Sequence, residues 1–182
     1  MRTQSAIPRN YDDFPVSEAV LSDDLVYRYT LDRRWAWDGP VMVWIGLNPS
    51  TADHQADDPT IRRMCGFARR EGCRGICVLN LYALRATDPR ELARHPDPVG
   101  PENDDWLAGV GIAADGPVVA AWGAHPFAAR REQAVTQLLA LAGVTQLMCL
   151  GMTGQGYPNH PLYLRADAPL VPWEPAEADR WP

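Results

Sequence analysis

Two asparagines and one histidine have the side-chain types and the positions to carry out chemistry. Asn48 and Asn80 each stand at the end of an apolar run, and His160 lies on a proline-flanked stretch. An asparagine can hold a water molecule through its carbonyl oxygen but cannot remove a proton from it. It therefore suits a reaction whose leaving group departs early and whose nucleophile needs only positioning. A histidine can donate a hydrogen bond to the negative charge that develops on such a leaving group.

The stretch Gly46-Leu47-Asn48-Pro49-Ser50 has the composition of a tight turn beside a ligand. Gly46 allows close approach of the backbone, and Pro49 stiffens the turn. The amide of Asn80 carries a donor and an acceptor, which match the edge of a pyrimidine ring. Each asparagine also has a purely structural interpretation, because Asn48 can cap its own turn and Asn80 can satisfy backbone groups. The residues alone leave both interpretations open.

Four apolar runs that end in polar residues predict the sheet that positions these groups. Ligands of open α/β sheets bind at the carboxyl ends of the strands. Helical patterns separate the runs, which indicates right-handed βαβ units. We therefore expect a three-layer α/β/α sandwich with a short, mostly parallel four-stranded sheet and an antiparallel edge strand. The expected strands are 41–46, 76–79, 117–121 and 146–150, with 25–31 at the edge.

The remaining segments predict the helices and the domain boundaries. Residues 1–23 are polar and acidic and predict a loosely held N-terminal arm, and 24–182 form a single α/β domain. The segment after residue 150 is rich in Gly and Pro and is expected to be mostly loop, with a short extended piece near 162–164. Helices are expected from Asp57-Asp58-Pro59 to Gly72, over about 102–114 and over 125–142, with a short one from Asp88-Pro89 to His95.

The composition limits the classes of partner. The 182-residue chain has a net charge of −6, which argues against broad electrostatic binding to nucleic acid. All 17 basic residues are arginine, a bias that a GC-rich genome explains better than function does. Arg62 and Arg85 are candidates for phosphate contacts, although solvated arginines are the commoner case. No apolar run reaches the roughly 18 residues of a membrane span, and the start does not resemble a signal peptide, so we expect a cytoplasmic protein.

Neither a metal nor a cofactor is expected. The four cysteines have spacings that match no zinc pattern and are expected to be reduced, packed thiols. Asp53, Asp57 and Asp58 have the chemistry of a magnesium site. A helix start explains the last two without any metal, because acidic residues suit the exposed amides there.

The order of these motifs resembles that of the uracil-DNA glycosylase superfamily over about residues 41–165. The members of that superfamily share a short parallel sheet between helices, and the resemblance implies the same fold and activity for this chain. The first motif is similar to the asparagine form found in mismatch-specific uracil and thymine glycosylases. The stretches that carry the resemblance are Gly46-Leu47-Asn48-Pro49, Cys77-Val78-Leu79-Asn80, Val118 to His125, and His160-Pro161-Leu162.

The resemblance implies a role for each matching residue. Asn48 would position the water and His160 would stabilise the departing base, while Asn80 would read the base edge. Leu162 would intercalate, although the classical enzymes have serine at that position, and Ser50 stands where they have tyrosine. A stacking aromatic is missing just after the first motif, and either Tyr82 or Tyr157 would replace it. The substrate-binding set is Gly46, Pro49, Ser50, Thr51, Asn80, Tyr82 and Tyr157; the DNA- or phosphate-binding set is Arg62, Arg85 and Leu162.

A longer pattern is similar to a family of uncharacterised bacterial and phage proteins. It runs from Tyr27-Arg28-Tyr29 through Asp58-Pro59-Thr60 to Asn80-Leu81-Tyr82-Ala83-Leu84. That resemblance implies no particular activity.

Three hypotheses for function follow. The first is an enzyme, a monomeric DNA N-glycosylase of the uracil-DNA glycosylase type that releases a uracil-like, modified or damaged base. The second keeps the site but hydrolyses or binds free nucleotides or nucleosides, which suits the acidic charge. The third is a non-catalytic module that binds nucleic acid or protein, in which replacement of Asn48 by Ala would leave the cellular activity intact. Under the first two hypotheses the partner is DNA or a nucleotide, and no membrane is involved.

Overall fold

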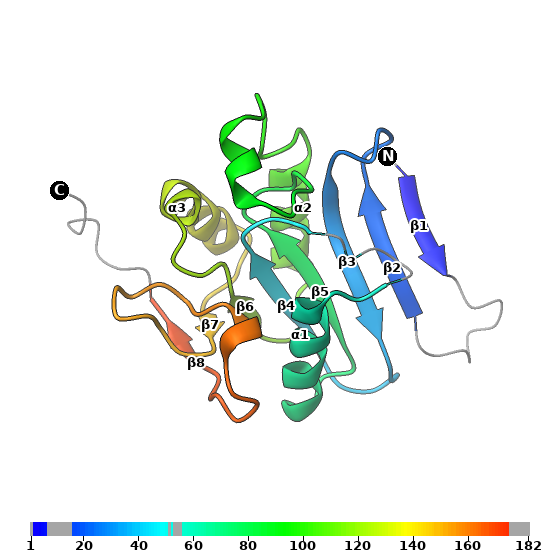
Figure 1. Ribbon diagram of the computed structural model, residues 1–182. Coiled ribbons are helices and arrows are strands. Elements are labelled where there is room, and N and C mark those ends of the chain that lie inside the picture. The colour runs from blue at the N-terminus through cyan, green and yellow to red at the C-terminus, as the bar shows by residue number, and fades with distance from the viewer. Residues whose placement is uncertain (1, 7–15, 51, 53–55, 175–182) are drawn as a thin grey trace.

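The described residues form a single eight-stranded mixed sheet with helices on both faces (Figure 1). The computed structural model describes residues 2–6, 16–50, 52 and 56–174. The strand order is β1-β2-β3-β5-β4-β6-β7-β8. The strands are β1 (Arg2–Ala6), β2 (Val16–Leu21), β3 (Arg28–Arg34), β4 (Val41–Gly46), β5 (Gly75–Asn80), β6 (Val118–Ala120), β7 (Leu147–Cys149) and β8 (Val171–Trp173).

The prediction of a short, mostly parallel four-stranded sheet is wrong. The neighbours β5, β4, β6 and β7 do pair in parallel. The four other pairings within the described residues are antiparallel, and they add β1, β2 and β3 on one side and β8 on the other. β2 lies in the segment expected to be a loose arm, yet it is paired with β3 and buries Ala19 and Leu21.

Helix α1 (Pro59–Arg70) begins and ends where the sequence predicts. The Asp58 carboxylate accepts a hydrogen bond from the Ile61 N–H at 2.9 Å, and Pro59 occupies the first turn, where it costs no helical hydrogen bond. Gly72 follows the helix with a φ of 73°, a left-handed conformation that glycine adopts without strain.

The other predicted helices are close to their expected positions, and one additional short helix is present. The predicted extended piece near 162–164 is wrong, because Pro161 and the His160 cap start a short 3-10 helix there. The helices are α2 (Asn103–Ala113), α3 (Pro126–Leu141), the 3-10 helix η1 (Pro89–Ala93) and the 3-10 helix η2 (Pro161–Tyr163).

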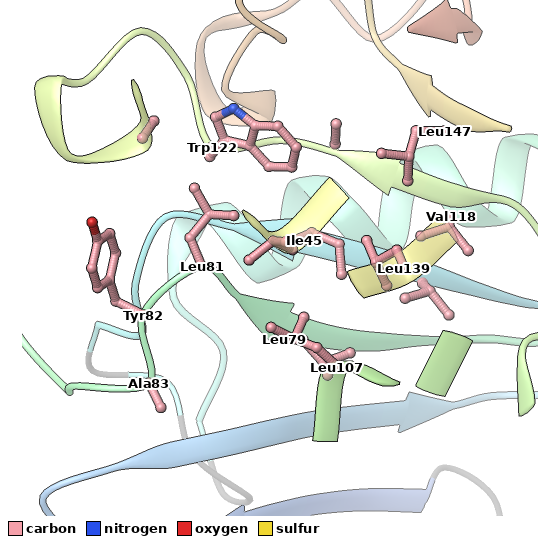
Figure 2. Close-up of a cluster of buried hydrophobic side chains, with 14 of the residues drawn as sticks. Ile45, Leu79, Leu81, Tyr82, Ala83, Leu107, Val118, Trp122, Leu139 and Leu147 are labelled. Atoms are coloured by element: carbon pink, nitrogen blue, oxygen red, sulfur yellow. The ribbon is translucent and has the colours of Figure 1, made fainter. Parts of the chain in front are cut away.

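The sheet separates two hydrophobic clusters that share no residue. Along β4, Trp44 belongs to the cluster under α1, and Ile45 to the cluster under α2 and α3. Successive side chains of a strand point to opposite faces, so one strand contributes to both clusters. Figure 2 shows the cluster under α2 and α3, in which Ile45 and Leu79 lie near Leu107 of α2.

An extra residue in β3 changes the direction of two side chains. Val20 of β2 pairs with Thr30 and Leu21 pairs with Arg28, so Tyr29 is a bulge. The Tyr29 ring stacks on Trp106 of α2, with 6.3 Å between centroids. Arg28 instead reaches the α1 side of the sheet, where its guanidinium donates to the Ala52 carbonyl oxygen at 2.6 Å. The bulge therefore delivers a buried cation to the connection between β4 and α1.

The four cysteines are free thiols, three of them buried and Cys65 half-buried. Within the described part of the chain, no helix is long and apolar enough to cross a membrane.

Candidate functional site

The carboxyl ends of β4, β5 and β6 lie side by side and bring the first motifs together. Gly46 and Asn80 are register partners in the parallel pair β4–β5, and Ile45 pairs with Ala120 of β6. Asn80 shares the parity of Ile76 and Val78, which face α1, so its side chain lies on the α1 side of the sheet. The parallel strands thus place the predicted motifs at one edge.

The carboxamide of Asn80 is buried, and its nitrogen has no hydrogen-bond partner among the described residues. The residue is 4% exposed, and within the described part of the chain Nδ2 makes no hydrogen bond. Its Oδ1 lies 2.7 Å from the position that a β-carbon would take on Gly46. A buried donor left unsatisfied costs about 1–3 kcal/mol, so such a group calls for an explanation. A ligand that offers an acceptor at this edge of the sheet would satisfy this donor.

The backbone beside Asn80 is held by a residue that the sequence analysis missed. Asn103, at the start of α2, is fully buried, and its Nδ2 donates to the carbonyl oxygens of Asn80 and Leu81 at 3.2 and 3.1 Å. Arg131 of α3 adds a third donor, at 3.3 Å from the Leu81 oxygen. These bonds fix the point at which the chain leaves β5. An asparagine at a helix start is usually a cap, so no sequence pattern indicated that Asn103 binds the backbone after β5.

The amide of Asn48 is oriented by two backbone carbonyls. Its Nδ2 donates to the oxygens of Ala86 at 2.7 Å and Pro49 at 3.1 Å. The Ala86 N–H donates in turn to the Pro49 oxygen at 2.9 Å. Because the amide nitrogen is engaged, Oδ1 points away from these carbonyls, and no hydrogen bond among the described residues uses it. This oxygen can accept a hydrogen bond from water.

Two buried arginines of β3 hold the connection between β4 and α1. Arg28 donates to the Ala52 oxygen, and the Arg33 Nε lies 2.8 Å from the Asp57 carboxylate. Both arginines are under 10% exposed. In the sequence they belong to a predicted edge strand and the residues just after it, and nothing in the local pattern indicated that they turn inward.

His160 caps η2 through a ring nitrogen that accepts a hydrogen bond. Its Nδ1 accepts from the Leu162 N–H at 3.4 Å, which places the ring proton of the neutral imidazole on Nε2. Burial lowers the pKa of His160, and the charge of Asp58 opposes that shift only in part. A neutral imidazole with its proton on Nε2 can donate a hydrogen bond to an anion without carrying a charge itself.

The position of His160 links three segments. Its β-carbon is 3.5 Å from the point where Gly123, after β6, would carry a β-carbon. Asp58 at the start of α1 is close enough to influence its pKa, and η2 packs against α1. His160 therefore lies on the same side of the sheet as Asn80. No hydrogen bond among the described residues joins His160, Asn48 and Asn80 to one another, so their convergence on one nucleobase stays a prediction.

The other predicted substrate-binding residues occupy varied environments. Tyr82 is 5% exposed, and its hydroxyl donates to the Phe127 oxygen at 2.9 Å, so its ring packs in the core (Figure 2). Tyr157 and Ser50 are half-buried, and Pro49 is buried. Thr51 lies outside the described residues.

The two arginines predicted to contact phosphate form hydrogen bonds within the protein. Arg62 is exposed but donates to the Asp57 oxygen, and Arg85 donates to the Leu25 oxygen at 3.0 Å. Leu162, the predicted intercalating residue, is half-buried.

The acidic residues considered for metal binding have structural partners. Asp58 caps α1, and Asp57 pairs with Arg33. Asp53 lies outside the described residues. Among those described, no group of three or more histidine, cysteine or acidic side chains is placed to hold a metal ion.

Fold and site together define an α/β protein with a candidate ligand site at the carboxyl edge of its parallel strands, on the α1 side. The chain belongs to the family described as "Protein of unknown function (DUF1643)", whose model matches residues 28–162. The matched range runs from the bulge in β3 to η2 and contains Asn48, Asn80 and His160. No curated protein and no solved structure matches the chain.

Proposed function

We propose that this protein is an N-glycosylase of the uracil-DNA glycosylase type that releases a uracil-like, modified or damaged base from DNA. The observation that carries the proposal is the buried amide nitrogen of Asn80 at the edge of the sheet, which has no hydrogen-bond partner among the described residues. A base carbonyl oxygen would accept from that nitrogen and remove the penalty of leaving it unsatisfied.

The reaction assigns a separate task to each residue. The bond between the base nitrogen and the sugar carbon C1′ breaks, and its electron pair leaves with the base. The Nε2–H of His160 donates a hydrogen bond to the base oxygen on which this negative charge collects. A water held by Asn48 Oδ1 attacks C1′ and forms the new C–O bond. One proton of that water passes to solvent, and the base anion takes up a proton after release.

Charge and arginine usage favour a second candidate, hydrolysis of the same bond in a free nucleotide or nucleoside. The net charge of −6 opposes a long polyanion. Arg62 and Arg85, the expected phosphate contacts, donate to the protein's own carbonyl groups. A small substrate needs only a local site, so it depends less on these side chains.

Base release from a panel of substrates tests both candidates. The panel contains oligonucleotides with uracil, hypoxanthine, mismatched thymine or hydroxymethyluracil, together with the free nucleotides. We expect Asn48→Ala to lower the rate by on the order of 100-fold, because the attacking water loses its position. Leu141→Ala, an exposed change at the end of α3, should keep the wild-type rate. Absence of base release from every substrate would refute both candidates.

A further inference from the structure

Tyr163 places an aromatic ring in solvent next to the proposed leaving-group residue. It is 83% exposed and follows His160 by three positions in η2. The two ring centroids are 5.6 Å apart, with the planes tilted by 45°. His160 is half-buried, so the pair of rings runs from the interior of the protein to its surface.

The backbone that carries Tyr163 is fixed by its neighbours. The Tyr163 N–H donates to the His160 oxygen at 3.4 Å, and the Leu164 N–H donates to the Pro161 oxygen at 3.3 Å. The guanidinium of Arg63, on α1, donates to the Leu164 oxygen and ties η2 to that helix. A tyrosine on a fixed backbone loses little conformational entropy when its ring binds a flat partner.

Solvent exposure by itself does not mark a binding residue, because single exposed aromatic side chains are common. Two features distinguish Tyr163. Its ring contacts His160, and its backbone is held on both sides by hydrogen bonds. Leu162, expected from the sequence to make the contact with DNA, is half-buried, and its N–H is used by His160. The exposed side chain next to His160 is therefore Tyr163, one position after Leu162.

We propose that Tyr163 stacks on a nucleobase adjacent to the one whose sugar bond lies at His160. This inference rests on the proposed function and names the residue that binds the neighbouring part of its substrate. Stacking on an aromatic side chain tolerates any base sequence, because every base has a flat face. The inference therefore requires a strand of at least two nucleotides, because a free mononucleotide has no adjacent base.

Binding of a fluorescein-labelled, uracil-containing single-stranded oligonucleotide, followed by fluorescence anisotropy, tests the role of the ring. Tyr163→Ala should weaken binding about tenfold or more, and Tyr163→Phe should restore it. Leu141→Ala is the matched control, since Leu141 is 88% exposed at the end of α3, and it should bind as the wild type does. Uridine monophosphate has one base and no neighbour for Tyr163, so it should displace the oligonucleotide only at much higher concentration; displacement at similar affinity would show that no adjacent base is bound and would overturn the inference.

Three further outcomes would overturn the inference: equal binding by all variants, an equal loss in Tyr163→Phe and Tyr163→Ala, or no binding of the oligonucleotide by the wild type. Base release, measured on the same samples, separates this inference from the proposed function. Ring-dependent binding without base release refutes only the glycosylase. Base release and binding that are both insensitive to Tyr163→Ala refute only the role of Tyr163.

Discussion

The side-chain oxygen of Asn80 lies over the α-carbon of Gly46, 2.7 Å from the point where a β-carbon would stand. The two residues are register partners at the carboxyl ends of β5 and β4. A glycine is needed at position 46 for the sake of its neighbour as well as for any ligand. The first motif and the strand-ending asparagine therefore form one interlocked unit.

Replacement of Gly46 by alanine should disturb this unit. A new β-carbon at this position forces either the Asn80 side chain or the β4 backbone to move. Overpacking of this kind lowers the free energy of unfolding by about 1–3 kcal/mol. Gly66→Ala in α1 is the control, because no atom of the described residues lies within 4 Å of its β-carbon position and alanine favours a helix. Urea unfolding should show a loss for Gly46→Ala and no loss for Gly66→Ala. A Gly46→Ala variant of full stability would contradict the packing described.

Two buried asparagines should respond to alanine in opposite ways. Asn80→Ala removes an unsatisfied donor, so the free energy of unfolding should stay near the wild-type value, while base release falls at least about 100-fold. Asn103→Ala removes two hydrogen bonds to buried carbonyls and should cost about 2 kcal/mol or more. Equal destabilisation of the two variants in urea would show that the Asn80 amide stabilises the fold and needs no ligand.

The protonation of His160 should link stability to pH. Its pKa in the folded protein is lowered from the ordinary value of 6.5 by burial. Below about pH 6.5 the unfolded chain therefore binds a proton that the folded chain does not, and the free energy of unfolding falls as the pH drops toward the lowered pKa. Base release should fall at lower pH, where His160 of the folded protein is itself protonated and Nδ1 can no longer accept from the Leu162 N–H.

Urea unfolding of the wild type and of His160→Gln between about pH 8 and pH 5 isolates this contribution. The variant should lack the part of the pH dependence that His160 causes. Identical pH dependences would contradict the assignment.

A mutation that creates a cavity on the α2 side of the sheet should lower the free energy of unfolding without affecting the candidate site on the α1 side. Leu107 of α2 is fully buried in the cluster opposite α1 (Figure 2), and Leu107→Ala should cost about 2–5 kcal/mol. Ile112→Ala, on the same helix but 76% exposed, should change stability by less than about 0.5 kcal/mol. Oligonucleotide binding at low temperature, where both variants are folded, should equal that of the wild type. Weaker binding by folded Leu107→Ala would show that the two sides are coupled.

The parts of the fold that the sequence predicted are those with strong local signals. The buried strand β4 is a continuous apolar run, and α1 has an acidic cap, an early proline and an apolar stripe. β2 and β8 were missed because neither has such a run. β2 buries only Ala19 and Leu21, and β8 has three residues, one of them Pro172, which a strand near the edge of the sheet tolerates. Pairing with a neighbour, which no local pattern records, makes these segments strands.

The site could be predicted only where one residue carries the signal. Asn80 is recognisable as the polar end of an apolar strand, and its buried position agrees with that pattern. The contributions of Arg28 and Asn103 depend on a bulge and on contacts across many residues, so the sequence did not reveal them. The inward orientation of Tyr82 was missed for the same reason, since its partner Phe127 comes from a distant helix.

The sheet divides the interior into two compartments that are buried independently. Neither candidate catalytic residue, Asn48 or His160, belongs to the described cluster under α2 and α3, so this cluster can supply cohesion while the opposite compartment carries the candidate site. A mutational path toward a new substrate could then rebuild the α1 side within a chain that still folds. In such a family, the chemistry of the site would restrict new activities sooner than the loss of folding stability would.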